Sequence, residues 1–263
     1  MNPTVARDFI HRRPFVFSAL LIAAVTAVDV LLIATRDLLS VELAVISTGI
    51  ISGAVLSVLG VLVITRLGIW RELGFVRRPA RPRTLLWFLP FALYGLLPLA
   101  QGLNISAGRT AAAVAFGVLI ATWKLIALAL FFYAWLPRGP RTAAALTAAV
   151  WATMHLGGIL VGASVAPTLM LCLSYLFLAY AFVCVWLRTE LLWPLVATYA
   201  LLLTSAIAVQ DTDASNLASS VTGLIPAVAT SVLLAAYGLA ISRRARLDSA
   251  HAPTRSTAGT VAT

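Results

Sequence analysis

The chain has 263 residues, of which 61% are hydrophobic and only 11% are charged. Soluble domains are about 45–50% apolar and about 25% charged, so this composition excludes a water-soluble globule. The formal net charge of +10 raises the question of nucleic-acid binding. Because the basic residues stand at the ends of apolar runs and form no basic face or motif, we expect no nucleic-acid partner.

Eight apolar runs follow one another along the chain, and each approaches the roughly 20 residues needed to cross a bilayer as a helix. They cover residues 15–35, 41–64, 84–100, 110–136, 142–161, 168–187, 191–209 and 221–241. We therefore predict an all-α, polytopic membrane bundle of about eight transmembrane helices in the plasma membrane. The bundle is expected over residues 15–242, between an N-terminal tail at 1–14 and a disordered, Ala-, Thr-, Ser- and Arg-rich tail at 243–263.

The arginines predict the orientation of the bundle. Sixteen lie in the two tails and in the loops after the second, fourth and sixth runs, whereas Arg36 and Arg109 lie on the other side. Under the positive-inside rule, this asymmetry places both termini in the cytoplasm.

Three ionisable residues fall inside the apolar runs: Asp29, Lys124 and His155. Such residues cost about 2.5–3.5 kcal/mol each on insertion scales. Counted from the cytoplasmic end of each run, all three lie at a depth of about 18–21 Å. Asp29 and Lys124 are therefore candidates for a buried ion pair or for a proton or substrate relay, and His155 for a neutral imidazole bonded to a nearby backbone or hydroxyl group. Since the other two histidines lie in the tails, we expect no bound metal and no cofactor.

Four stretches, in order, resemble the CPBP family of intramembrane endopeptidases, which includes the type II CAAX-prenyl proteases and bacteriocin self-immunity proteins. Together they cover roughly residues 65–205. They are Trp70-Arg71-Glu72-Leu73-Gly74-Phe75, the end of the fourth run at 131–139, Trp151-Ala152-Thr153-Met154-His155-Leu156, and the stretch 187–198.

The resemblance implies a site in which a Glu pair activates water, while histidines and an Asn help to bind the water and the oxyanion. His155 matches the Phe-x-x-x-His motif of that family, with Trp in place of Phe. Thr198 stands where the second His belongs and Leu202 where the Asn belongs. If Arg138 is the motif arginine, Tyr133 and Ala134 occupy the glutamate positions; in the other register these are Leu128 and Ala129.

Between Glu72 and Glu190 the sequence contains no Asp or Glu. General-base activation of water needs a positioned group that accepts a proton, and a histidine without an orienting acid or an oxyanion donor is a poor substitute. Glu190 is the nearest carboxylate along the chain that could serve, and Arg138 and Arg141 are also suited to face anionic lipid headgroups.

Three functions remain open. The first is a catalytically degraded relative that binds a membrane-embedded or prenylated peptide, or another partner. The second is an active intramembrane peptidase that uses His155 in a rearranged site, with Thr153, Thr198 or Tyr199 nearby. The third is a small transporter with an Asp29–Lys124 relay.

Overall fold

The structure is a computed structural model that describes residues 3–34, 41–77, 79, 81–101, 107–160, 164–209 and 221–250. All regular secondary structure in these residues is helical. The α-helices are α1 (Pro3–Arg12), α2 (Pro14–Ala34), α3 (Val41–Leu67), α4 (Leu89–Leu96), α5 (Ala107–Trp135), α6 (Pro140–Thr153), α7 (Gly157–Leu160), α8 (Val165–Thr189), α9 (Trp193–Val209) and α11 (Val221–Ala250). The 3-10 helices are η2 (Pro82–Phe88), η3 (Leu97–Gln101), η4 (Leu136–Arg138) and η5 (Met154–Leu156).

Helix occupies each of the eight apolar runs predicted from the sequence. Among the described residues, four helices are long and apolar enough to cross a membrane, and a fifth candidate is the pair α1–α2, which is bent by 103°. Large apolar side chains cover the outside of the bundle, as at Leu20, Val58 and Leu233, which are 58–69% exposed. A surface of this kind is suited to lipid rather than water. The chain is an integral membrane protein; the number of crossings and the cytoplasmic side of the termini stay predictions.

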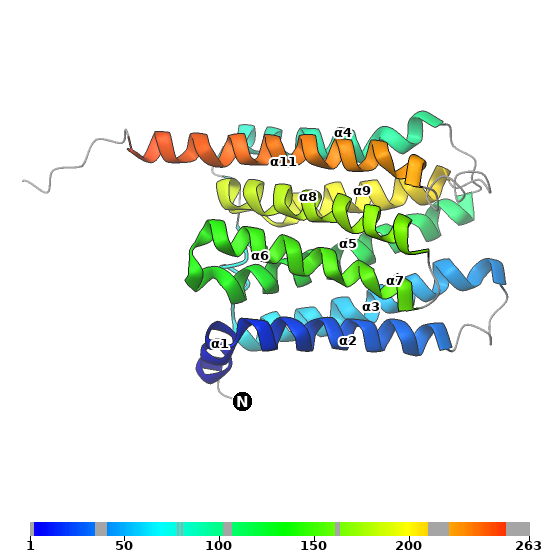
Figure 1. Cartoon of the computed structure of the whole chain (residues 1–263), viewed down its shortest axis with the longest axis horizontal. Helices are drawn as coiled ribbons and strands as arrows, with labels where there is room; N and C mark the ends of the chain where they lie inside the picture. Colours follow the sequence, from blue (N-terminus) through cyan, green and yellow to red (C-terminus); the bar gives the residue numbers. More distant parts are fainter. Residues whose placement is uncertain are drawn as a thin grey trace, which may run out of the picture.

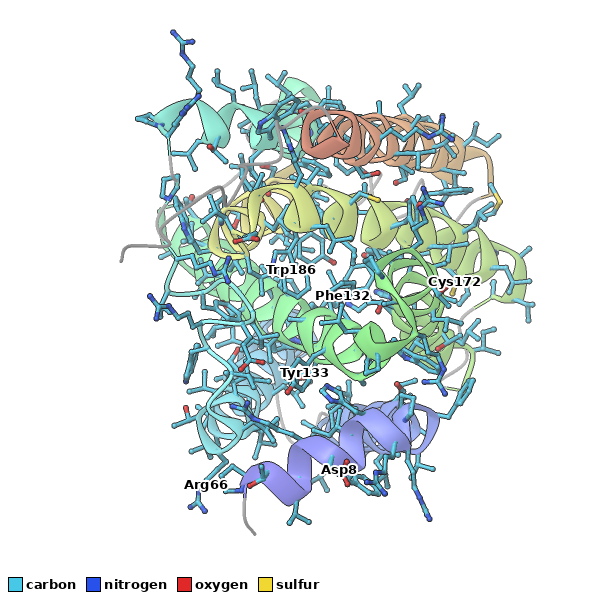
Figure 2. All side chains as sticks on the ribbon, turned by 90° about the vertical axis from the view of Figure 1, so that its left-hand side faces the viewer. Asp8, Arg66, Phe132, Tyr133, Cys172 and Trp186 are labelled. Atoms are coloured by element: carbon cyan, nitrogen blue, oxygen red, sulfur yellow. The ribbon has the colours of Figure 1, made fainter. Side chains whose placement is uncertain are left out.

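The helices lie side by side in two layers (Figures 1 and 2). One layer holds α2, α6, α8 and α11, and the other holds α3, α5, α9 and α4. α8 packs between α6 and α11, while α5 packs between α3 and α9 and also contacts α6. Helix α1 and the last turns of α11 lie at the same end of the bundle (left in Figure 1). We call this the basic end, because Arg138, Arg141 and Arg188 also lie at the helix ends there.

Small residues set the distance between neighbouring helices. Gly49 and Gly53 of α3 form a G-x-x-x-G pair facing α5, and a Cβ added at Gly53 would lie 3.0 Å from Leu119 Cβ. Gly117 of α5 faces α9 in the same way, with the carbonyl of Ala200 2.8 Å from such a Cβ. Because lipid supplies no hydrophobic force between helices, close backbone approach of this kind is a main source of their association.

The run at 84–100 forms three short helices rather than one long helix. Pro82 begins η2, Pro90 lies in the first turn of α4, and Pro98 lies in η3. Proline has no N–H to donate and its ring clashes with the preceding turn, so it is tolerated near a helix start but not inside. Because the three prolines are eight residues apart, each lies at or near the start of one short helix, and no single long helix forms.

The N-terminal segment, which we expected to be a tail, is a helix docked on the bundle. Arg7 of α1 donates from Nε and Nη2 to the carbonyl of Leu67, at 2.8 and 2.5 Å, and pairs with Glu72 at 3.2 Å. Ala6 and Ile10 are buried on the same helix. At the other terminus, α11 continues to Ala250, into the segment expected to be disordered from residue 243, because Arg, Ala and Leu are good helix formers.

The loop after α3 is fixed to the turn between α8 and α9. Gly74, at φ +78°, packs directly on the backbone carbonyl of Glu190 and accepts a hydrogen bond from the N–H of Leu192 at 3.4 Å. Arg77 forms an ion pair with the Glu190 carboxylate. Glu190 itself is left-handed at φ 57° and ends α8. These contacts hold Glu190 at the basic end.

Candidate functional site

A cavity of about 380 Å³ lies between α2 and α3 on one side and α5, α6 and α7 on the other. Most of its wall is apolar. Five polar side chains also line it: Thr26, Thr48, Ser52, Lys124 and His155. This combination of an apolar wall and a few polar groups, at this size, is typical of a ligand-binding pocket.

A break in the helix positions His155 at this cavity. α6 ends at Thr153, and Met154–Leu156 form one 3-10 turn before α7 begins at Gly157. One turn earlier, Trp151 is fully buried and donates from its indole Nε1 to the backbone carbonyl of Lys124 at 3.2 Å. A 3-10 turn within a helical segment often marks a functional position, and here it follows the anchored Trp151.

Lys124 and His155 are in direct contact. The Lys124 Nζ lies 3.1 Å from His155 Nε2, and His155 Nδ1 lies 3.3 Å from the carbonyl oxygen of Trp151. A carbonyl oxygen only accepts, so Nδ1 carries the proton; Nε2 of a neutral ring then accepts from the Lys124 ammonium. The hydrogen bonds thus assign a neutral imidazole whose single lone pair is occupied by Lys124.

An aromatic shell surrounds this pair. The Tyr175 ring of α8 stacks on the imidazole, with centroids 3.7 Å apart and planes 21° from parallel. Lys124 Nζ lies 5.1 Å from the centroid of the same tyrosine ring, within the range of a cation–π interaction. Trp151 meets both the imidazole and Tyr175 edge-on, each at 5.4 Å. The shell fixes the imidazole plane and provides electron-rich faces for the ammonium.

The predicted partner of Lys124, Asp29, lies in α2, but its side chain is outside the described residues. Val25 and Thr26, which line the cavity, precede it by four and three residues. The ion pair or relay predicted from Asp29 and Lys124 therefore stays a prediction, whereas the common depth expected for Lys124 and His155 agrees with their contact.

Tyr133 and Arg138 do not lie near His155. Tyr133 is nine residues beyond Lys124 on α5, about 13 Å along the helix axis, and its ring meets His11 of α1 at 4.6 Å. Arg138 lies farther along, with its guanidinium 4.8 Å from the Trp135 ring and 5.9 Å from that of Phe15. In Figure 2, which faces the basic end, Tyr133 points away from Phe132, whose ring packs on Trp186 in the core.

Thr198 and Glu190 are held elsewhere. The Thr198 hydroxyl donates to the carbonyl of Leu195 at 3.1 Å, and its own carbonyl faces Gly95 of α4. Glu190 follows Tyr175 on α8 by fifteen residues, a rise of about 22 Å. The Glu190 carboxylate is thus paired with Arg77 at the basic end, far from the imidazole that it was considered to assist.

Sequence reasoning missed the aromatic members of the site. Tyr175 lies in a run of apolar residues on α8. Because this helix is apolar on nearly every side, its sequence does not show which side faces α6. Trp151 was noticed only as the first residue of the histidine motif. A signal was present in the four-residue spacing of Trp151 and His155, which places both on one helix face.

Comparisons with family models, curated proteins and solved structures gave no match. Among the described residues, no group of three His, Cys, Asp or Glu side chains is arranged to hold a metal ion.

Proposed function

We propose that this integral membrane protein is a non-catalytic relative of the CPBP intramembrane endopeptidases, which binds a membrane-embedded or prenylated peptide without cleaving it. The binding site is the cavity beside Lys124 and His155. The CPBP relationship is supported by the four sequence stretches, and the loss of catalysis by the Lys124–His155 contact.

This contact is the observation that carries the proposal. A general base must offer a free lone pair to the proton that it removes. The lone pair of His155 Nε2 accepts from Lys124, and Nδ1 donates to Trp151. Among the described residues, the polar groups that line the cavity are hydroxyls, Lys124 and His155, none of them a carboxylate. The site is therefore suited to binding rather than to activation of water.

The chemistry of the cavity also indicates which end of a ligand it binds. Lys124 can donate to an anionic oxygen, and the hydroxyls of Thr26, Thr48 and Ser52 lie in the same wall. The apolar remainder of the wall suits a hydrocarbon or an apolar side chain. A peptide that ends in a free carboxylate next to a lipid-modified cysteine has both features.

The proposal is tested with the purified full-length protein in lipid nanodiscs and a farnesylated, fluorescent peptide with a free C-terminal carboxylate. We expect saturable binding with no cleavage product by mass spectrometry after overnight incubation. Lys124→Met should weaken binding about tenfold or more, because a hydrogen bond to a charged group contributes about 1.5–3 kcal/mol. The C-terminal methyl ester of the same peptide should bind the wild type as weakly as the free acid binds the variant.

Arg138→Gln is the matched control, since it removes a cation at the basic end and should leave binding unchanged. Cleavage of the peptide that disappears in His155→Ala would instead establish the second candidate, an active peptidase. Absence of saturable binding to wild-type protein, or equal binding of acid and ester, would overturn the proposed ligand chemistry.

A further inference from the structure

A second pocket, at the basic end, is lined by arginines from three different helices. Arg141 lies in the first turn of α6, Arg188 in the last turn of α8, and Arg243 on α11. Together with Tyr180 and Ser242, they surround a pocket of about 430 Å³. These residues are far apart in the sequence, so the fold itself brings the three guanidinium groups to one place.

Arginines are the only charged side chains among the described residues that line this pocket. The start of α6 adds to the positive potential, because the N-cap, Gly139, has no side chain to satisfy the first N–H groups of the helix. An anion that lies between three guanidinium groups can accept several charge-assisted hydrogen bonds.

The arginine pocket continues into an apolar groove on the same three helices. A second hollow of about 440 Å³ shares Tyr180 and Leu239 with the first, and the rest of its wall is entirely apolar, with Phe177 and Val232 among its residues. Phe177 precedes Arg188 by eleven residues, and Val232 precedes Arg243 by the same number, a rise of about 16 Å toward the middle of the bundle. The groove therefore runs along the helix axes, as an acyl chain does in a bilayer.

We infer that this composite surface is a binding site for one anionic phospholipid. The phosphate lies among Arg141, Arg188 and Arg243, and one acyl chain lies in the groove between α6, α8 and α11. Basic pockets between membrane helices recognise anionic headgroups through the same chemistry. The site shares no residue with the Lys124–His155 cavity, so either proposal can fail without the other.

Native mass spectrometry of the purified full-length protein, titrated with phosphatidylglycerol or phosphatidylcholine, tests the headgroup. We expect the wild type to retain phosphatidylglycerol at least tenfold better than phosphatidylcholine. Near an anionic surface each arginine contributes about fivefold in affinity, so the variant R141Q/R188Q/R243Q should lose nearly all of this preference. The control R71Q/R81Q/R83Q removes three exposed arginines at the same end and should retain it.

Two further measurements distinguish a lipid from a soluble anion. Ala145→Trp fills the apolar groove but keeps the arginines, and should weaken phosphatidylglycerol binding at least fivefold. Millimolar inorganic phosphate or glycerol phosphate should not displace the lipid. If free phosphate binds as well as the lipid and Ala145→Trp has no effect, the ligand is a soluble anion and the lipid assignment is wrong.

Circular dichroism and gel filtration of each variant identify any that do not fold. Should the triple arginine variant fail this check, the three single variants replace it, each with an expected loss of about fivefold. Equal retention of the two lipids by the wild type, or equal losses in the two triple variants, would overturn the site.

Discussion

The phenol ring of Tyr175 stacks on the imidazole of His155, although the two residues lie on different helices and are twenty residues apart in the sequence. The same phenol ring faces the Lys124 ammonium at 5.1 Å. One aromatic side chain of α8 thus contacts two of the five polar side chains that line the cavity. The position of α8 and the orientation of the imidazole are therefore linked.

This stack predicts different effects for two substitutions. Tyr175→Phe keeps the ring, so its melting temperature in detergent should stay close to that of the wild type. Tyr175→Leu loses an aromatic pair, which contributes about 0.5–1.5 kcal/mol beyond its buried area, and the cation–π contact as well. A fluorescence thermal-shift assay measures both variants, and an equal change in the two would contradict the importance of the stack.

The tautomer of His155 is a prediction for nitrogen NMR. In histidine-labelled protein at pH 7, we expect the His155 ring to be neutral, with the proton on Nδ1, because Nδ1 donates to Trp151 and Nε2 accepts from Lys124. Lys124→Met should shift the Nε2 resonance, since its hydrogen-bond donor is lost. The signals of His11 and His251 serve as internal controls. A proton on Nε2 in the wild type would exclude the proposed arrangement.

The close contact between α5 and α9 predicts that alanine is destabilising at Gly117 but not at Gly157. Gly117→Ala places a Cβ 2.8 Å from the carbonyl oxygen of Ala200. To relieve this overlap, α9 would have to move away from α5, which weakens the packing of the two helices. Gly157→Ala meets no atom within 4 Å. We expect a clear fall in melting temperature for the first variant and no fall for the second. Similar values for both would show that helix spacing tolerates the extra methyl group.

Alanine substitutions at two other glycines, Gly74 and Gly139, distinguish the effect of backbone strain from that of a steric overlap at the basic end. Gly74 and Gly139 both have positive φ, at 78° and 93°, and Gly139, with ψ 146°, lies in a region used almost only by glycine, so alanine is strained at each by about 1–3 kcal/mol. Only at Gly74 does the new Cβ also collide with the carbonyl of Glu190. Gly74→Ala should therefore destabilise the protein more than Gly139→Ala in the same thermal assay. The reverse order would mean that the loop after α3 is not fixed to the end of α8.

The Asp29–Lys124 pair predicted from the sequence can be tested by a double-mutant cycle. If the two side chains interact, Asp29→Asn and Lys124→Met should each lower stability, and the double variant should lose less than the sum, with a coupling of about 0.5–3 kcal/mol. Strict additivity would indicate that they do not touch. A double variant that also supports any assayed transport like the wild type would remove the relay hypothesis.

The positions of the helices could be read from the sequence, because long apolar runs have few alternatives in a membrane. The depth of Lys124 relative to His155 also followed from helical rise alone. The 3-10 turn at His155 could not be predicted from the sequence, since it follows Trp151, which donates a hydrogen bond to the carbonyl of Lys124 on another helix. Rotation of a helix about its own axis is encoded weakly when its faces are equally apolar, and this is why Tyr175 was missed.

The docking of the N-terminal segment was also not predicted from the sequence, because it depends on contacts with distant residues. Its sequence, with Arg7, Arg12 and Arg13 before an apolar run, predicts a basic flank. The docking of α1 depends on the position of the Leu67 carbonyl at the end of α3 and of Glu72 after it. Neither is near Arg7 in the sequence, and local pattern contains no information about such a contact.

The hydrogen bonds from Arg7 to Leu67 span sixty residues. During synthesis, the ribosome must therefore add those sixty residues before the guanidinium meets its acceptor. The hydrogen bonds of Arg7 form only where the end of α3 lies beside α1, so they require the α2–α3 pair to be packed. Loss of this contact would therefore report a defect in the packing of α2 against α3, even though Arg7 belongs to neither helix.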